Sequence, residues 1–385
     1  MSCTAPEGFT AAGVAAGIKT SGALDLALVV NEGPDHAAAG VFTRNRVKAA
    51  PVLWSQQVLR GGRLRAVVLN SGGANACTGP AGFQDVHATA EHAAKLLGDT
   101  GAGEVAVCST GLIGERLPLA KLLAGVDAAA AARARTGGRA AAEAIMTTDT
   151  RPKTTVVEAA PGFTVGGMAK GAGMLAPSLA TMLAVLTTDA VADPATLDAA
   201  LRVAVRTSFE RIDADGCLST NDTVLLLASG ASGCQPSAEQ LSSAVRQACE
   251  ELAWQLIGDA EGATKRVGIE VSGAASEDDA VEVARAVARN NLVKTALFGG
   301  DPNWGRILAA VGTTAAAFDP DRLDVAINGI WVCRAGCAAD DRSKVDLSGR
   351  EVAIQIALHA GDATATVYTS DLSHGYVHEN SAYST

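Results

Sequence analysis

The sequence predicts an α+β protein in which helices pack on the faces of β-sheets. Strand-like and helix-like runs alternate along all 385 residues, and no long linker or low-complexity tail separates them. Hydrophobic residues make up 48% of the chain but aromatic residues only 4%, so Ala, Val, Leu and Ile must form the core. A chain of this length can bury a core of one large or two ordinary domains.

The individual elements follow from the spacing of apolar residues. Short apolar runs bounded by turn formers predict strands at Leu64–Leu69, Glu104–Cys108, Thr181–Thr187, Asp222–Leu227, Val267–Val271, Leu323–Ile327, Val352–Ala357 and Ala363–Tyr368. Apolar residues three and four apart, or runs of alanine, predict helices at Phe83–Leu97, Ala128–Ala134, Arg139–Met146, Pro194–Phe209, Ser237–Ile257 and Asp278–Ala288.

Charge and hydropathy restrict the partners. The formal net charge is −10, which argues against a nucleic-acid partner, because phosphate binding relies on basic patches. The first residues lack the basic and apolar regions of a signal peptide, and no stretch is apolar for the length of a membrane span. We therefore expect a cytoplasmic protein that binds small molecules and does not bind a membrane.

Metal and cofactor motifs are missing from the sequence. The eight widely spaced cysteines are interpreted as buried thiols of a reducing compartment, and Cys333 and Cys337 lack partners for a four-ligand zinc site. His374 and His378 are expected in a C-terminal loop with a structural or solvent-facing role. The patterns of the α/β-hydrolase serine, the phosphate-binding loop, the dinucleotide fold and the zinc proteases are all absent. The expectation is no metal and no cofactor.

One unusual segment, 165–182, holds four glycines, a proline and Lys170 before an apolar strand that begins at Thr181. A glycine-rich loop lets the backbone approach a ligand, and a lysine among apolar residues needs a partner such as a substrate carboxylate. Thr181 could act as a nucleophile if the chain is cut before it, because the new α-amine would serve as its base. The residues alone leave equally open an ordinary loop that leads into a strand.

Eight motifs, in order, give the chain a resemblance to the ornithine acetyltransferase family, the bifunctional glutamate N-acetyltransferases of the cyclic arginine pathway. The resemblance extends from Gly8 to the last residue. The motifs are Asn70–Gly79, Ser109–Gly114, Ile145–Thr150, Gly166–Thr181, Ser219–Thr223, Glu261–Lys265, Leu292–Arg306 and Gly375–Thr385.

The resemblance implies a layered α/β sandwich of the N-terminal-nucleophile type, related to the aminopeptidases, with a smaller C-terminal α/β part. It also implies autocatalytic cleavage between Ala180 and Thr181. The fragments 1–180 and 181–385 would fold together as one catalytic unit. Two copies of each are expected to form a heterotetramer.

The family's functional residues map onto this chain one by one. Thr181 matches the nucleophile, and Thr110 and Gly111 match the pair that stabilises the oxyanion. The matching substrate-binding residues are Thr147, Lys170, Thr181, Glu261, Asn380 and Thr385. Lys170 would pair with the substrate's α-carboxylate and Glu261 with an amine.

Structural alternatives remain for several of these residues. Thr110 and Gly111 could form an ordinary turn after a strand, Glu261 could be a solvated carboxylate, and Asn380 a turn former. Thr147 is preferred to Thr148 from its spacing to Lys170. The chain also departs from the family's N-S-G-N-A-N loop, because Gly73 stands at the fourth place.

The implied reaction transfers an acetyl group from N2-acetylornithine to glutamate by a ping-pong mechanism. Whether acetyl-CoA is a second donor stays open. An aminopeptidase or amidase of related fold is the alternative enzyme, and an uncut amino-acid-binding protein is the alternative from another class.

Overall fold

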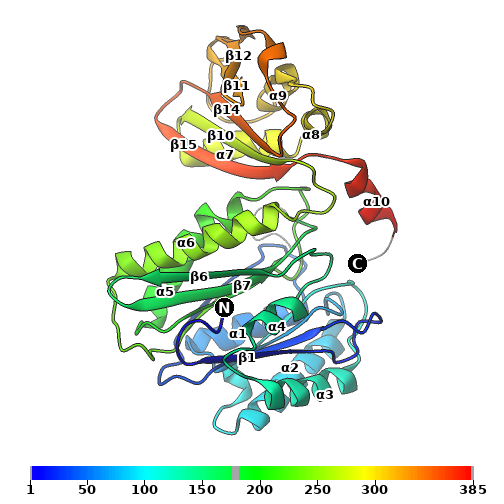
Figure 1. Cartoon of the computed structure of the whole chain (residues 1–385), viewed down its shortest axis with the longest axis vertical. Helices are drawn as coiled ribbons and strands as arrows, with labels where there is room; N and C mark the ends of the chain where they lie inside the picture. Colours follow the sequence, from blue (N-terminus) through cyan, green and yellow to red (C-terminus); the bar gives the residue numbers. More distant parts are fainter. Residues whose placement is uncertain (1, 176–181, 383–385) are drawn as a thin grey trace. The chain divides into compact units, whose positions relative to one another are not determined.

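The computed structural model describes residues 2–175 and 182–382, which form two compact units (Figure 1). The first unit contains the described residues of Met1–Glu210 and Cys217–Asp259. The second contains those of Arg211–Gly216 and Ala260–Ser384. Ala180, Thr181 and Thr385 lie outside the described residues.

The first unit contains two β-sheets. One has the strand order β1-β2-β4-β5, in which β4 and β5 are parallel and the other neighbours are antiparallel. The other has the order β3-β9-β8-β7-β6, with β8 and β9 parallel. The strands are β1 (Phe9–Val14), β2 (Leu26–Asn31), β3 (Ala38–Phe42), β4 (Ala66–Asn70), β5 (Val105–Ser109), β6 (Lys153–Ala159), β7 (Phe163–Lys170), β8 (Leu183–Thr188) and β9 (Thr223–Ala228).

Helices pack on both sheets of this unit. The helices are α1 (Ala50–Val58), α2 (Gly79–Leu97), α3 (Leu119–Ala132), α4 (Gly138–Ala144), α5 (Pro194–Thr207) and α6 (Ala238–Ile257). Helices α1, α2 and α3 contact strands of the first sheet, whereas α5 and α6 contact strands of the second. One hydrophobic cluster contains residues of both sheets, such as Val67 and Leu225. The unit is therefore layered as helix, sheet, sheet and helix (Figure 1), which confirms the predicted layered α/β fold.

The glycine-rich segment before Lys170 is a strand and not the predicted loop. Strand β7 pairs with β6 on one side and β8 on the other. A Cβ at Gly166 would lie 2.3 Å from the Ser2 carbonyl oxygen, and one at Gly167 would lie 3.1 Å from a Leu252 methyl carbon. Glycine is needed here because other parts of the chain pack directly on the strand. The loop interpretation was wrong because the conformational preferences of single residues carry no information about these tertiary contacts.

Helix starts in this unit follow from capping side chains. The Asp193 carboxylate accepts hydrogen bonds from the backbone N–H groups of Ala195 and Thr196, which begins α5. Ser237 and Gln240 form a reciprocal capping box at the start of α6. The starts of both helices therefore carry the capping residues that made α5 and α6 predictable from the sequence.

The second unit contains a sheet of order β13-β12-β11-β14-β10-β15. Its strands are β10 (Arg266–Ala274), β11 (Asp324–Ile327), β12 (Ile330–Arg334), β13 (Cys337–Ala338), β14 (Glu351–Ala357) and β15 (Ala363–Ser370). Its helices are α7 (Glu277–Ala288), α8 (Asn291–Phe298), α9 (Trp304–Val311) and α10 (His374–Ala382). Helix α7 packs on β10 and β15 around a core of valine, isoleucine and alanine. This is the smaller C-terminal α/β part that the family resemblance implies.

Two expectations about side chains need correction. His374 and His378 lie on α10 and not in a loop, and His374 packs edge-on against Phe298. The eight cysteines are free thiols, but Cys77, Cys217 and Cys337 are exposed, so the expectation that all eight are buried was wrong.

Within the described ranges, no helix combines the length and apolar character that a membrane span needs.

Candidate active site

Thr110 and Gly111 follow directly after β5, at the edge of the first sheet where the parallel strands β4 and β5 both end. The Thr110 backbone N–H donates to the Asn70 carbonyl oxygen at 3.0 Å, and Thr110 also forms a β-bridge with Gly73. Thr110 is buried. The turn therefore lies in a fixed position between two chain segments, and is more constrained than an ordinary exposed turn.

Gly111 occupies a conformation that favours glycine, with φ of +128°. A Cβ at this position would lie 2.8 Å from the backbone nitrogen of Gly73. Gly73 thus lies against the expected oxyanion pair, so the departure from the family pattern falls directly beside Gly111. A Cβ at Gly73 would meet a Leu117 methyl carbon at 3.0 Å, so a larger residue there requires Leu117 to shift.

Lys170 ends strand β7 and brings a buried positive charge to the same place. Its Nζ lies 3.4 Å from Thr110 Oγ1. The lysine is only 2% exposed although it carries an ammonium group. A buried ammonium beside the expected oxyanion pair can attract a carboxylate or a developing negative charge.

Asp149 supplies the negative charge that balances this part of the unit. Its Oδ1 accepts hydrogen bonds from Lys153 Nζ at 2.5 Å and from Gly171 N at 2.7 Å. Burial alone would raise the pKa of the Asp149 carboxyl, but Lys170, Lys153 and these hydrogen bonds outweigh it and lower the pKa to about 2. Asp149 is therefore a carboxylate at neutral pH, and it joins Lys153 to the segment that contains Lys170.

Thr147 is connected to this network through its backbone. Its N–H donates to Asp149 Oδ2 at 3.0 Å. The preference for Thr147 over Thr148 as a substrate-binding residue stays a prediction, because this contact does not involve the hydroxyl group.

The segment Ser219–Thr223 lies beside the oxyanion pair. The Asn221 side-chain amide donates to the carbonyl oxygens of Ser109, at 2.8 Å, and Ala74, at 2.6 Å. The next residue, Asp222, accepts a hydrogen bond from the backbone N–H of Met182 through Oδ1 at 3.1 Å. The ends of β5 and β7 and the beginnings of β8 and β9 therefore meet in one site.

Sequence reasoning did not assign a role to Asp149, Asn221 or Asp222, although each lies in a motif that it singled out. The sequence feature that could have identified these residues was their place in a polar cluster with Thr or Asn shortly before a strand. That signal does not distinguish a turn former from a site residue.

Glu261 and Asn380 belong to the second unit and contact each other there. Asn380 Nδ2 donates to Glu261 Oε2 at 2.9 Å and to the Tyr376 carbonyl oxygen at 3.0 Å. Asn380 is part of helix α10, so the turn-former alternative is wrong. Gly262, with φ of +61°, packs against the start of the same helix: a Cβ there would lie 2.1 Å from Tyr376 N.

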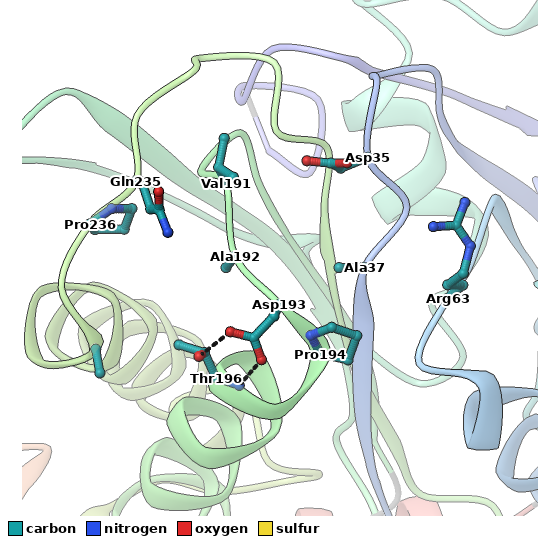
Figure 2. Close-up of a pocket in the computed structure, with 11 residues that line it drawn as sticks. Asp35, Ala37, Arg63, Val191, Ala192, Asp193, Pro194, Thr196, Gln235 and Pro236 are labelled. Atoms are coloured by element: carbon teal, nitrogen blue, oxygen red, sulfur yellow. Dashed lines mark hydrogen bonds between the residues drawn. The ribbon is translucent and has the colours of Figure 1, made fainter.

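Figure 2 shows a pocket of the first unit that is separate from these residues. Asp35, Arg63, Asp193, Thr196 and Gln235 are among its lining side chains. The Asp193 carboxylate is engaged as the cap of α5 and also accepts from the Thr196 hydroxyl at 2.6 Å (Figure 2). None of the predicted site residues that the structure describes lines this pocket. Two of its polar side chains, Asp193 and Thr196, thus serve to cap a helix.

A metal site finds no support in the described ranges, where His, Cys, Asp and Glu side chains form no group of three that could hold an ion. The polar residues around Thr110 and Lys170 instead suit organic substrates with carboxylate and amide groups.

The ArgJ family profile matches residues 10–385. The chain belongs to the ArgJ family. It is 66% identical to the arginine biosynthesis bifunctional protein ArgJ of Streptomyces coelicolor, and the match covers 100% of both chains. It is 64% identical to the protein of the same name from Thermobifida fusca, again over 100% of both.

A solved structure is also similar to part of the chain. The ornithine acetyltransferase of Mycobacterium tuberculosis, in complex with ornithine, is 68% identical over 47% of this chain and 96% of its own, with a TM-score of 0.45.

ArgJ membership confirms the resemblance carried by the eight motifs. It also confirms the acyltransferase class and the assignment to arginine biosynthesis, and decides against both the aminopeptidase and the non-catalytic binding protein.

Proposed function

We propose that this chain transfers an acetyl group from N2-acetylornithine to glutamate through an acetyl ester on Thr181, which becomes an N-terminal residue when the chain cuts itself after Ala180. The observation that carries the proposal is the meeting of Thr110, Gly111 and Lys170 in one site of an ArgJ family member. The ornithine bound to the relative from Mycobacterium tuberculosis supports an ornithine-containing substrate.

The first half-reaction forms the acetyl-enzyme. Thr181 Oγ attacks the acetyl carbonyl carbon while the Thr181 α-amine takes the hydroxyl proton. The Thr110 hydroxyl and the Gly111 N–H donate to the oxygen that becomes negative, an effect of about 3 kcal/mol for one such donor. The α-amine then returns the proton to the leaving nitrogen, and ornithine departs.

The second half-reaction uses the same pocket. The amine of glutamate attacks the acetyl ester and yields N-acetylglutamate, and Thr181 recovers its hydroxyl. Lys170 holds the α-carboxylate that both amino acids share, and Thr147, Glu261, Asn380 and Thr385 complete substrate binding. Glu261 suits the side-chain amine of ornithine, and its hydrogen bond with Asn380 supports a joint role for these two residues.

The two fragments are proposed to stay together as one catalytic unit and to pair as a heterotetramer of two α and two β fragments. Strands β7 and β8, which flank the cleavage point, are hydrogen-bonded neighbours, and this pairing supports the joint fold. The eight free thiols suit a reducing cytoplasm. Light scattering combined with size-exclusion chromatography measures the proposed assembly.

The decisive assay incubates the purified chain with N2-acetylornithine labelled in the acetyl group, with and without glutamate. We expect labelled N-acetylglutamate only when glutamate is present. Release of labelled acetate without transfer would contradict the proposal. Replacing acetylornithine with acetyl-CoA in the same assay determines whether that donor is used.

A pair of threonine variants tests the nucleophile. Thr181→Ala should remain one chain on a denaturing gel and transfer no acetyl group. Thr164→Ala, in β7 at the end opposite to Lys170, is the matched control and should be cut and active. Two fragments from Thr181→Ala would exclude Thr181 as the nucleophile of cleavage.

A further inference from the structure

Asp371 joins two segments of the second unit that are far apart in the sequence. It directly follows β15 and is buried, and its Oδ1 accepts the backbone N–H groups of Thr264 and Lys265, both at 2.9 Å. Its Oδ2 accepts the Thr264 hydroxyl. These partners precede it by 107 and 106 positions, so the carboxylate does not serve a local turn. It holds the loop that begins with Glu261.

Ser373 adds a second connection to the same loop. Its hydroxyl donates to the Gly262 carbonyl oxygen at 2.5 Å and accepts the backbone N–H of Tyr376 at 3.1 Å. The second bond satisfies a backbone donor in the first turn of α10. Asp371 and Ser373 together, here called the clasp, therefore fix the loop 261–265 against the start of α10.

Lys294, in α8, fixes the chain on which the clasp is built. Its Nζ donates to Thr369 Oγ1 at 3.1 Å and to the Ser370 carbonyl oxygen, and its own carbonyl oxygen accepts the Leu372 N–H at 3.3 Å. The Lys294 side chain is buried. Exchanging such buried hydrogen bonds for bonds to water is costly, so the clasp has a fixed position in the second unit.

Helix α10 depends on the clasp for its orientation. None of its nine residues, all of which the structure describes, is buried. Because the helix buries no apolar face, its polar contacts must fix it in place. One of these contacts is the 2.9 Å hydrogen bond from Asn380 to Glu261. The clasp connects the segments that carry these two residues, and so it controls how their side chains meet.

We propose that Asp371 is a positioning residue for the recognition of ornithine's side-chain amine. It does not contact the substrate and acts through Glu261 and Asn380. A carboxylate offers about four acceptor sites, so Glu261 can accept from Asn380 and from an ammonium group together. The clasp holds the loop and the helix so that this carboxylate keeps one geometry. This inference rests on the roles that the proposed function gives to Glu261 and Asn380.

The positioning role makes an expectation about selectivity that a purely structural role does not. A hydrogen bond between an ammonium and a carboxylate weakens steeply when its distance or its angle is wrong. Ornithine and norvaline have the same carbon chain and the same α-groups, and norvaline lacks only the side-chain amine. The ratio of the norvaline to the ornithine dissociation constant, here called the discrimination ratio, therefore reports this one contact.

Titration calorimetry of the purified full chain, without an acetyl donor, measures both dissociation constants. For the wild type we expect a discrimination ratio of about ten or more, the effect of one hydrogen bond to a charged group. Asp371→Ala removes the bonds to Thr264 and Lys265 and should bring the ratio close to one. Asp371→Asn keeps an oxygen for both backbone N–H groups, so it should retain most of the wild-type ratio.

A double variant tests whether Asp371 acts through Glu261. Glu261→Gln removes the charge that binds the amine and should lower the discrimination ratio as Asp371→Ala does. Combining the two substitutions should lower it no further, because both remove the same contact. Losses that add up in the double variant would contradict this route of action.

Ser373→Ala and Asp324→Ala complete the set. Ser373→Ala removes one hydroxyl group of the clasp and should also lower the ratio, and it decides the question if Asp371→Ala does not fold. Asp324 is a buried carboxylate of the same unit, but its Oδ1 accepts the backbone N–H of Ala335 at 2.8 Å. Asp324→Ala, the matched control, should keep the wild-type ratio. An unchanged ratio in Ser373→Ala, or an equal fall in Asp324→Ala, would overturn the inference.

The outcomes separate this inference from the proposed function, because binding is measured without transfer. A wild type that transfers acetyl groups, and whose clasp variants keep the discrimination ratio, would overturn the inference and leave the function intact. A wild type that transfers none, and whose ratio depends on Asp371, would do the reverse. Equal binding of ornithine and norvaline by the wild type would contradict both the inference and the role of Glu261.

Discussion

At the scale of single residues, Gly111 connects backbone geometry to catalysis. With φ of +128° and the Gly73 backbone nitrogen 2.8 Å from the place of a Cβ, the position does not accept a side chain without a shift of the loop. We expect Gly111→Ala to lower the acetyl-transfer rate by about 100-fold, the cost of one displaced oxyanion donor. The measurement is kcat with acetylornithine and glutamate.

Gly114→Ala is the control for backbone strain in the same loop. Gly114 also has a positive φ, of +93°, but nothing lies within 4 Å of a Cβ built there. Its kcat should stay near the wild-type value, with only a small loss of stability. Equal losses of activity in both variants would show that strain, and not the contact with Gly73, controls the loop.

The functional residues that lie in recognisable motifs were the predictable part of the site. Thr110, Gly111 and Lys170 were assigned from matching motifs, and the structure brings them together. Asp222 was visible only as one acid in a polar cluster. Its complete burial and its contact with Met182 depend on three-dimensional packing, which no spacing along the chain encodes.

The environment of Asp213, in the second unit, leads us to expect that the stability of the folded state depends on pH. Its buried carboxylate accepts from Arg289 Nε at 2.7 Å, but burial outweighs this partner and raises the pKa to about 6. A carboxyl group with a raised pKa in the folded state contributes stability that is fully present below the unfolded pKa of 3.8 and is lost as the pH rises through about 6. The folded state should therefore gain stability on acidification, relative to a variant that cannot ionise.

Asp213→Asn measures this contribution. Between pH 7.5 and 4.5 we expect the wild type to gain about 2 kcal/mol of opening free energy relative to the variant. Hydrogen exchange of peptides from β15 reports it, because the Asp213 N–H donates to the Tyr368 carbonyl oxygen. A difference between the two proteins that is the same at both pH values would contradict the assignment.

At the scale of elements, strand β7 depends on its glycines. A Cβ at Gly166 would meet the Ser2 carbonyl oxygen and a Pro6 ring carbon, at 2.3 and 2.7 Å. We expect Gly166→Ala to destabilise the chain by about 1–3 kcal/mol, because the N-terminal segment must move away from the strand. Urea unfolding followed by circular dichroism measures the loss.

Gly268→Ala, in β10, is the matched substitution in a strand with space. The nearest atom to a Cβ there is a Tyr368 ring carbon at 3.7 Å, an ordinary contact. Its unfolding free energy should remain within about 0.5 kcal/mol of the wild-type value. If Gly268→Ala lost as much unfolding free energy as Gly166→Ala, the loss would come from replacing glycine in a strand and not from the contact with Ser2 and Pro6.

The secondary-structure elements differ in how well their residues predict them. Helices α5 and α6 were predicted within two residues of their ends because apolar spacing and capping residues agree. Strands such as β1 (Phe9–Val14) and β3 (Ala38–Phe42) were missed, because their alanine and glycine content gives no strand signal. Burial between layers holds such segments in a sheet, and this tertiary effect overrides propensity.

At the scale of the whole molecule, both proposed fragments contribute strands to one sheet, and the strands of the second fragment lie between those of the first. Strands β9 and β8, which follow residue 181, lie between β3 on one side and β7 and β6 on the other, all of which precede it. The pairing joins β3 to β9 and β7 to β8 along their lengths. Separating the fragments therefore requires breaking two strand interfaces and the hydrophobic core between the sheets.

We accordingly expect the cut protein to behave as one particle until it unfolds. On a denaturing gel it should give two bands, whereas size-exclusion chromatography in buffer should give one peak that contains both fragments. In increasing urea the fragments should separate only together with the loss of secondary structure, because the strands that join them are core strands of the unit. Thr181→Ala, which has no cut, should keep its mass at every urea concentration. Fragments that separate before the secondary structure is lost would contradict the interleaved arrangement, since each fragment would then hold its strands independently.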